Sequence, residues 1–216
     1  MKKREPKPTI TCRSRNGERG FSMVELAVVC MIICIIAAIA VIQLLPSWHT
    51  AQSDDALRLV LDQLRQAREY SIANRRYVQV SFPTVGGQAE VVITQWNTLT
   101  PGGGATNPVL STTYVEGPLQ YALVTGMPDT PDQFNTPSVG SSPVQFKIEG
   151  TSTVPVGNML FQSDGELIDS VTNLPIDGTI SIALAGNASS ARAVTVMGAT
   201  GRVHGWRSTG ASWIQF

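Results

Sequence analysis

One carboxylate lies inside an otherwise apolar run near the start of this 216-residue chain. The run extends over residues 21–45, and Glu25 is its only acidic or basic side chain. A charged group is costly in an apolar environment, so such a residue needs a partner or a function. The chemistry that this position predicts is therefore ion pairing or another specific role for the Glu25 carboxylate.

The apolar run is long enough to span a membrane as a helix. Its 25 residues would form a helix about 37 Å long at about 1.5 Å per residue, which exceeds a typical hydrocarbon core. Residues 1–20 carry seven basic and two acidic side chains, a net charge of +5, whereas residues 21–216 have a net charge of −5. A basic flank stays on the cytoplasmic side. We therefore expect residues 47–216 on the far side of the membrane.

Two other interpretations of the run stay open. A secretory signal peptide would end at small residues such as those at 38–40, but apolar sequence continues to Leu45 and Glu25 would have no role. A plain single-pass anchor would let Glu25 snorkel to the membrane interface.

The other reactive residue types predict neither an enzyme nor a metal site. Cys30 and Cys34, four residues apart in the apolar run, are expected to pack as small apolar side chains. His49 and His204 are the only histidines, and the sequence has no metal-ligand spacing or phosphate loop. Residues 164–166, Asp-Gly-Glu, fit an ordinary turn better than a calcium loop because the EF-hand spacing is missing. We expect a protein without catalytic activity, metal or cofactor.

The elements that must position these residues begin with a second helical segment. Between residues 47 and 76, apolar side chains recur with the i, i+3, i+4, i+7 spacing of an amphipathic helix. Pro46 predicts a kink or short break before this segment, and Ser53 or Asp54 is a plausible N-cap. Residues 21–46 are thus the expected transmembrane helix and residues 47–76 the expected amphipathic helix.

Residues 77–216 predict a strand-rich domain. Tyr, Val and Ile alternate with polar residues in short segments, and Gly86-Gly87 predicts a hairpin between the first two. Strands are expected at residues 77–82, 90–96, 119–124, 144–148, 159–162, 178–183, 191–197, 201–207 and 213–216. Residues 97–157 are rich in Pro, Gly, Ser and Thr and are expected to form loops around two short strands. A helix followed by antiparallel strands implies an α+β fold.

The start of the apolar run resembles the signal of type IV prepilins and of type II secretion prepseudopilins. The residues that carry this resemblance are Gly20-Phe21-Ser22-Met23-Val24-Glu25-Leu26. It implies that residues 1–20 are a leader, which prepilin peptidase removes between Gly20 and Phe21, and that Phe21 becomes N-methylated. It also implies that Glu25 pairs with the terminal amine of a neighbouring subunit, which fits the cost of an unpaired buried charge.

Later segments are similar to the GspH/FimT group of pilin-like proteins. They are residues 64–76 followed by Val78, the "F-x-x-x-G" element at 161–165, and residues 191–196 followed by Gly201-Arg202-Val203. The resemblance implies a pilin-like fold, in which a long N-terminal helix packs on an antiparallel sheet. It implies a minor pseudopilin of the bacterial inner membrane, assembled with other pseudopilins or pilins into a periplasmic filament. The alternative is a minor type IV pilin involved in pilus assembly or DNA uptake.

A small basic cluster bears on that alternative. Arg192, Arg202 and Arg207, with Trp206, form the only basic and aromatic cluster that the sequence places outside the helix. Minor pilins of the GspH/FimT group can bind DNA, so the resemblance implies nucleic-acid contact at these arginines. Three arginines on an acidic domain favour solvated strand faces instead, since net negative charge gives no long-range attraction to nucleic acid.

Overall fold

The computed structural model describes residues 21–96, 107–134, 142–151, 154 and 157–216, and for residues 41–47 the backbone alone. The predicted leader, residues 1–20, lies outside the described residues. Two compact units, Met1–Leu44 and Leu45–Phe216, make up the chain. The first helix, α1 (Met23–Asn74), begins in the first unit and ends in the second.

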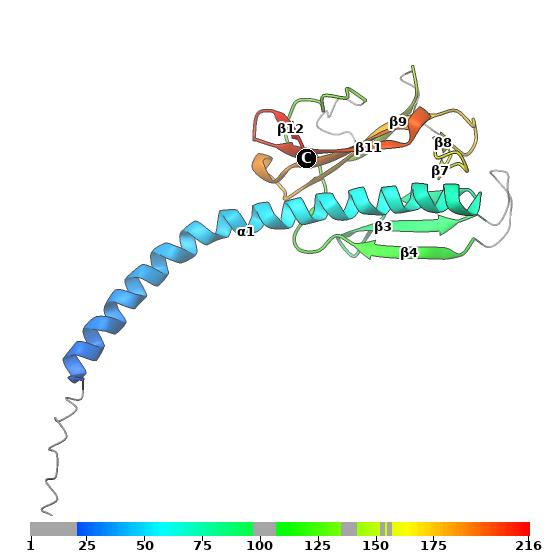
Figure 1. The fold of residues 1–216 in the computed structure, drawn as a ribbon. Helices are drawn as coiled ribbons and strands as arrows, with labels where there is room; N and C mark the ends of the chain where they lie inside the picture. The colour runs from blue at the N-terminus through cyan, green and yellow to red at the C-terminus, as the bar shows by residue number, and fades with distance from the viewer. Residues whose placement is uncertain (1–20, 97–106, 135–141, 152–153, 155–156) are drawn as a thin grey trace, which may run out of the picture. The chain divides into compact units, whose positions relative to one another are not determined.

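The first unit contains the apolar part of α1, drawn in blue in Figure 1. Within the described residues, this is the one helix that is long and apolar enough to cross a membrane, over Met23–Ala40. All described side chains of that segment are exposed in the isolated chain. An apolar helix exposed on every side is typical of a membrane span or of a helix that packs against other chains.

The α1 helix continues through Pro46, so the predicted break and the predicted N-cap are wrong. A proline removes one helical hydrogen bond, and here the residues on both sides keep helical backbone. Ser53 lies inside the helix, where its Oγ donates to the His49 carbonyl one turn earlier at 2.8 Å. The end of α1 has a left-handed residue, Arg75 (φ 51°), and the Arg76 amide donates to the Ser71 carbonyl at 3.2 Å. This geometry is that of a Schellman C-cap.

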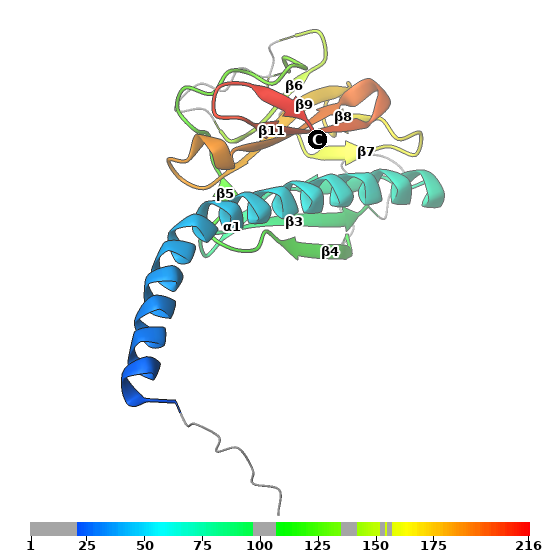
Figure 2. The ribbon, with the colours of Figure 1, turned by 60° about the vertical axis from the view of Figure 1, so that its left-hand side comes forward.

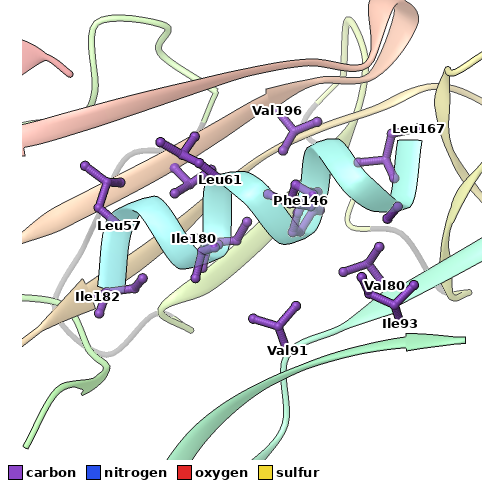
Figure 3. Packing of buried hydrophobic residues seen from close by; sticks show 14 of the residues in the cluster. Leu57, Leu61, Val80, Val91, Ile93, Phe146, Leu167, Ile180, Ile182 and Val196 are labelled. Atoms are coloured by element: carbon purple, nitrogen blue, oxygen red, sulfur yellow. The ribbon is translucent and has the colours of Figure 1, made fainter. Parts of the chain in front are cut away.

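The second half of α1 contributes a buried stripe to the core of the second unit. The stripe consists of Leu57, Val60, Leu61, Leu64 and Ala67, each no more than 4% exposed. All belong to one hydrophobic cluster with residues of both β-sheets, and Figure 3 shows the side chains of this cluster around the helix. The spacing of these residues confirms the amphipathic helix predicted for this part of the chain.

The first sheet has the order β2-β3-β1-β7-β8, and β4 also pairs with β3. Its strands are β1 (Val78–Ser81), β2 (Thr84–Val85), β3 (Gln88–Gln95), β4 (Val109–Tyr114), β7 (Met159–Phe161) and β8 (Leu167–Asp169). Gly86 (φ 60°) and Gly87 (φ 85°) connect β2 to β3 with the two positive φ angles of a tight hairpin turn. This confirms the predicted hairpin.

The second sheet has the order β12-β11-β10-β9-β5, with β6 also paired to β9. Its strands are β5 (Gln120–Tyr121), β6 (Val144–Ile148), β9 (Ile176–Ala183), β10 (Arg192–Met197), β11 (Arg202–Ser208) and β12 (Trp213–Gln215). Short 3-10 helices, η1 (Ala188–Ser190) and η2 (Gly198–Thr200), connect β9 to β10 and β10 to β11. In Figures 1 and 2, β3 and β4 lie on one side of the second half of α1 and β9 and β11 on the other.

The α+β class and the antiparallel pairing of both sheets confirm the predicted fold class. Three of the described strands were not predicted. The two-residue strand β2 lies between the first two predicted strands. β4 lies within the segment expected to form loops, and β8 follows a turn after which no strand was expected. The pilin-like arrangement of the whole long helix on the sheet domain stays a prediction.

Candidate functional site

The predicted processing and assembly residues lie at the start of the first unit. Gly20 is outside the described residues, whereas Phe21 is 80% exposed directly before the helix. The Ser22 carbonyl accepts the first helical hydrogen bond, from the Leu26 amide at 3.0 Å, and the Ser22 hydroxyl accepts from the Val24 amide at 3.4 Å. The helix therefore begins within two residues of the predicted cleavage position.

Glu25 occupies the first turn of α1 and is exposed. A carboxylate in the first turn interacts favourably with the positive end of the helix dipole. In the described part of the chain, no cation lies within ion-pair distance of Glu25. The carboxylate is thus positioned at the start of an apolar helix and has its charge available for a partner.

The predicted basic cluster is corrected at Arg192, because this side chain is fully buried. Its Nε donates to Asp54 Oδ1 on α1 at 2.7 Å, and its Nη1 donates to the carbonyls of Ser189 and Ala191, both at 2.9 Å. Burial lowers the pKa of the Arg192 guanidinium, and the hydrogen bond and charge of Asp54 oppose that shift. A buried guanidinium with these partners cannot contact a nucleic acid at the surface.

Arg202 and Arg207 also do not form one patch. They are five residues apart on β11, and side chains separated by an odd number of positions point to opposite faces of a strand. Arg207, 46% exposed, lies 3.6 Å from Asp54 Oδ2 and so shares the carboxylate that binds Arg192. Of the three arginines predicted to contact nucleic acid, only Arg202 is exposed and lacks a carboxylate partner among the described residues.

We expect the loss of one partner of the Asp54–Arg192 pair to destabilise the second unit strongly. Asp54→Ala would leave the Arg192 charge buried without a counterion, at a cost of about 3–5 kcal/mol in the free energy of unfolding. Arg192→Met in the same chain should recover part of that loss, because it removes the stranded charge. Urea unfolding of the full-length chain in detergent micelles measures both variants.

The exposed Asp55–Arg58 pair, 3.9 Å apart on the same helix, provides the matched control. Its disruption by Asp55→Ala should cost less than about 1 kcal/mol, because water screens exposed ion pairs. Equal effects of Asp54→Ala and Asp55→Ala would contradict the structural role of the buried pair.

A second junction involves the residues that resemble the GspH/FimT group. Arg68 on α1 donates from Nε to the Gly165 carbonyl at 3.2 Å and from Nη2 to the Thr200 carbonyl at 3.0 Å. Gly165 (φ 90°) lies in the turn between β7 and β8, and Gly201 (φ 60°) directly precedes β11. A Cβ atom on Gly201 would lie 1.9 Å from the Gly165 carbonyl oxygen and 2.6 Å from Arg68 Nε. The three motif segments therefore meet at Arg68, and the two turns touch because Gly201 lacks a side chain.

Gly201→Ala is expected to destabilise the second unit. Left-handed backbone at Ala costs about 1–2 kcal/mol, and the clash with the Gly165 carbonyl should add about 1–3 kcal/mol of overpacking. Gly186→Ala is the matched control, since Gly186 (φ 76°) has open space where a Cβ would lie. The urea midpoint should fall clearly further for Gly201→Ala than for Gly186→Ala. Equal shifts of the urea midpoint in the two variants would mean that the contact between the two turns contributes nothing to the stability of the second unit.

His204 takes part in a polar network on the second sheet. Its Nδ1 lies 3.2 Å from Asp132 Oδ2, and the same carboxylate oxygen accepts from the Thr195 hydroxyl. Thr195 Oγ1 also accepts from Trp206 Nε1 at 2.8 Å. No group of three metal-ligating side chains occurs among the described residues. The network attaches the segment around Asp132 to β10 and β11.

Comparison with known proteins gives one match. Residues 15–41 match the prokaryotic N-terminal methylation motif. The chain matches no curated protein and no solved structure. The matched residues include the predicted cleavage position, Glu25 and most of the apolar span.

The chain therefore carries a type IV pilin-like prepilin signal, which implies processing by prepilin peptidase. Together with the apolar part of α1, this signal indicates a membrane-anchored, single-pass protein. The closer relation to the GspH/FimT group stays a prediction from the segments that meet at Arg68.

Proposed function

We propose that this chain is a minor pseudopilin, a structural subunit of the type II secretion pseudopilus. In this proposal the N-terminus is cytoplasmic, the apolar part of α1 spans the bacterial inner membrane, and the second unit lies in the periplasm. The observation that carries the proposal is the methylation motif at residues 15–41, with Glu25 in the first turn of an exposed apolar helix.

Cleavage between Gly20 and Phe21 would create the partner that Glu25 lacks. The new terminal amine of Phe21 stays basic after methylation, and it lies at the start of the same apolar helix. A carboxylate and an ammonium about 4 Å apart attract by about 4 kcal/mol at an effective dielectric constant near 20. Pairing between neighbouring subunits therefore offsets the cost of taking both charges into an apolar bundle.

This pairing would also set the axial register of the filament. In one stagger each Glu25 carboxylate meets an amine, whereas in any other stagger both charges remain unpaired in an apolar environment. The exposed side chains of Met23–Ala40 supply the apolar surface for bundling but little positional specificity. The charge pairing thus selects the axial register, and contact between the apolar surfaces drives the association of the subunits.

The second unit is proposed to act through contacts rather than through catalysis. Residues 47–216 contain no cysteine, so its core forms without an internal disulfide. The side chains of α1 and both sheets share one buried cluster, which gives a rigid body suited to presenting surfaces to other subunits or to exported proteins.

The second candidate function is that of a minor type IV pilin, in pilus assembly or DNA uptake. The prepilin signal supports it equally. The DNA-uptake form is less favoured, because Arg192 is buried and Arg207 shares Asp54 with it. The net charge of −5 outside residues 1–20 also opposes general attraction to DNA.

Deletion and complementation test the proposal in the source organism. Loss of the coding sequence should reduce the amount of type II substrates in the culture medium, and the wild-type chain should restore it. Pilus extension and DNA uptake, measured in the same strains, should be unchanged. Normal secretion with impaired pili or DNA uptake would contradict the proposal and favour the second candidate.

A further inference from the structure

A basic groove lies in the second unit between α1 and the start of β11, next to the Arg68 junction. Its volume is about 310 Å³. The residues that line it are Arg65, Arg68, Glu69, Gly201, Arg202, Val203 and His204. Three guanidinium groups against one carboxylate give the groove a net positive charge.

Two of these guanidinium groups have no counterion in the described part of the chain. Arg68 is held by two backbone carbonyls, which fix its position but do not neutralise its charge. Arg202 is exposed on β11, and no described carboxylate pairs with either residue. Arg65 has only an exposed, 3.9 Å contact with Asp62, which contributes little. The groove therefore presents uncompensated positive charge on a fixed framework.

The chemistry of the groove favours a carboxylate ligand. Guanidinium groups bind carboxylates through paired, charge-assisted hydrogen bonds. A volume of about 310 Å³ exceeds what a lone ion needs and lies at the lower end of the range for ligand sites. Such a groove accommodates one or two acidic side chains that project from another surface.

We infer that this groove binds an acidic segment of a neighbouring filament subunit, as a contact separate from the pairing of Glu25. The identity of the partner as a filament subunit rests on the function proposed above. Charge complementarity supports it, because the chain outside residues 1–20 has fourteen acidic and nine basic side chains, so a second copy of this chain would itself offer acidic side chains to the groove. The groove would fix the rotation of one second unit against the next.

A nucleic acid fits the same groove less well. A bound strand needs a track of cations interleaved with aromatic side chains. No aromatic ring other than that of His204 lines the groove. Arg192 is buried and Arg207 lies 3.6 Å from Asp54 Oδ2, so neither of these two arginines adds an unpaired cation to the groove.

In-cell photocrosslinking of the full-length chain tests this inference. A benzophenone amino acid at Glu69, an exposed position of the groove, should form an adduct with another subunit, and mass spectrometry should map it to a segment containing Asp or Glu. Arg202→Glu should reduce the adduct by about tenfold or more, whereas Arg202→Lys should retain most of it. Arg75→Glu, the same charge change at another exposed position of the second unit, should leave the yield unchanged.

Charge exchange gives the most specific result. Replacement of the mapped acidic residue by Lys, combined with Arg202→Glu, should restore the adduct. Because Arg202 is exposed, its variants should unfold at the wild-type urea concentration, which separates a binding effect from misfolding.

The remaining outcomes distinguish the two proposals. The chain could copurify with other subunits and yet form no adduct at Glu69, or form an adduct that Arg202→Glu does not reduce. Either result would overturn the groove inference and leave the proposed function intact. Absence of every filament subunit from the crosslinked and copurified material would overturn both. An adduct with nucleic acid whose yield falls with rising salt would overturn the inference, because it would show that the groove binds phosphate groups and not an acidic protein segment.

Discussion

Gly20→Trp is expected to leave the chain uncleaved in the membrane. Prepilin peptidase must bring the scissile bond after residue 20 close to its own catalytic groups, and a glycine permits that close approach of the backbone. A bulky side chain at this position would block it, whereas Gly20→Ala should only slow cleavage. The intact mass of the membrane-extracted chain measures the result, since the wild-type mass should lack residues 1–20 and include one methyl group.

The leader offers a matched control for this prediction. Gly17→Trp introduces the same side chain three residues earlier, away from the predicted cleavage site, and should leave the mature mass unchanged. A mature mass in Gly20→Trp equal to that of the wild type would rule out cleavage between Gly20 and Phe21.

Glu25→Leu is expected to be inserted and cleaved normally but to enter filaments poorly. The substitution removes the carboxylate that would pair with the terminal amine of a neighbour, so each amine stays unpaired in the apolar bundle. The Coulomb attraction of about 4 kcal/mol is partly offset by desolvation. We therefore expect incorporation to fall by about one to two orders of magnitude. Quantitative mass spectrometry of sheared or purified filaments measures it.

The isosteric variant Glu25→Gln separates charge from shape. It keeps the size of the side chain and one acceptor oxygen, with an NH2 group in place of the other oxygen. It should therefore assemble as poorly as Glu25→Leu if the charge is what matters. Normal incorporation of both variants would contradict ion pairing and favour the interpretation that Glu25 only snorkels to the membrane interface.

Much of the fold follows from local sequence patterns. The 3.6-residue spacing of apolar side chains identifies the buried stripe from Leu57 to Ala67, because one face of the helix joins the core. Strands β6, β9, β10 and β11 were predicted to within about two residues of their bounds. Gly86-Gly87 identifies a hairpin because both residues need positive φ.

The departures from prediction have physical causes. β4 lies in the segment rich in Pro, Gly, Ser and Thr, and none of its six residues is buried, so it lacks the alternation of apolar and polar side chains that marks a half-buried strand. β8 has only three residues, and all are buried, so alternation gives no signal. At Pro46 the local preference for a break is overridden by helical residues on both sides.

The two parts of the candidate site differ in how far sequence could identify them. Cleavage and methylation depend on a linear motif, so Gly20, Phe21 and Glu25 could be named without a structure. The Asp54–Arg192 pair joins residues 138 positions apart and requires the fold. A signal was nevertheless present, because Asp54 and Arg68 occupy polar positions in register with the buried stripe of α1.

The central claim is that this chain is a subunit of a type II secretion filament. In-cell crosslinking of the tagged full-length chain, with partners identified by mass spectrometry, tests it most directly. We expect crosslinks to other pseudopilins and to components associated with the outer-membrane secretin. Crosslinks to a major pilin and to pilus-tip proteins, without secretion components, would contradict it.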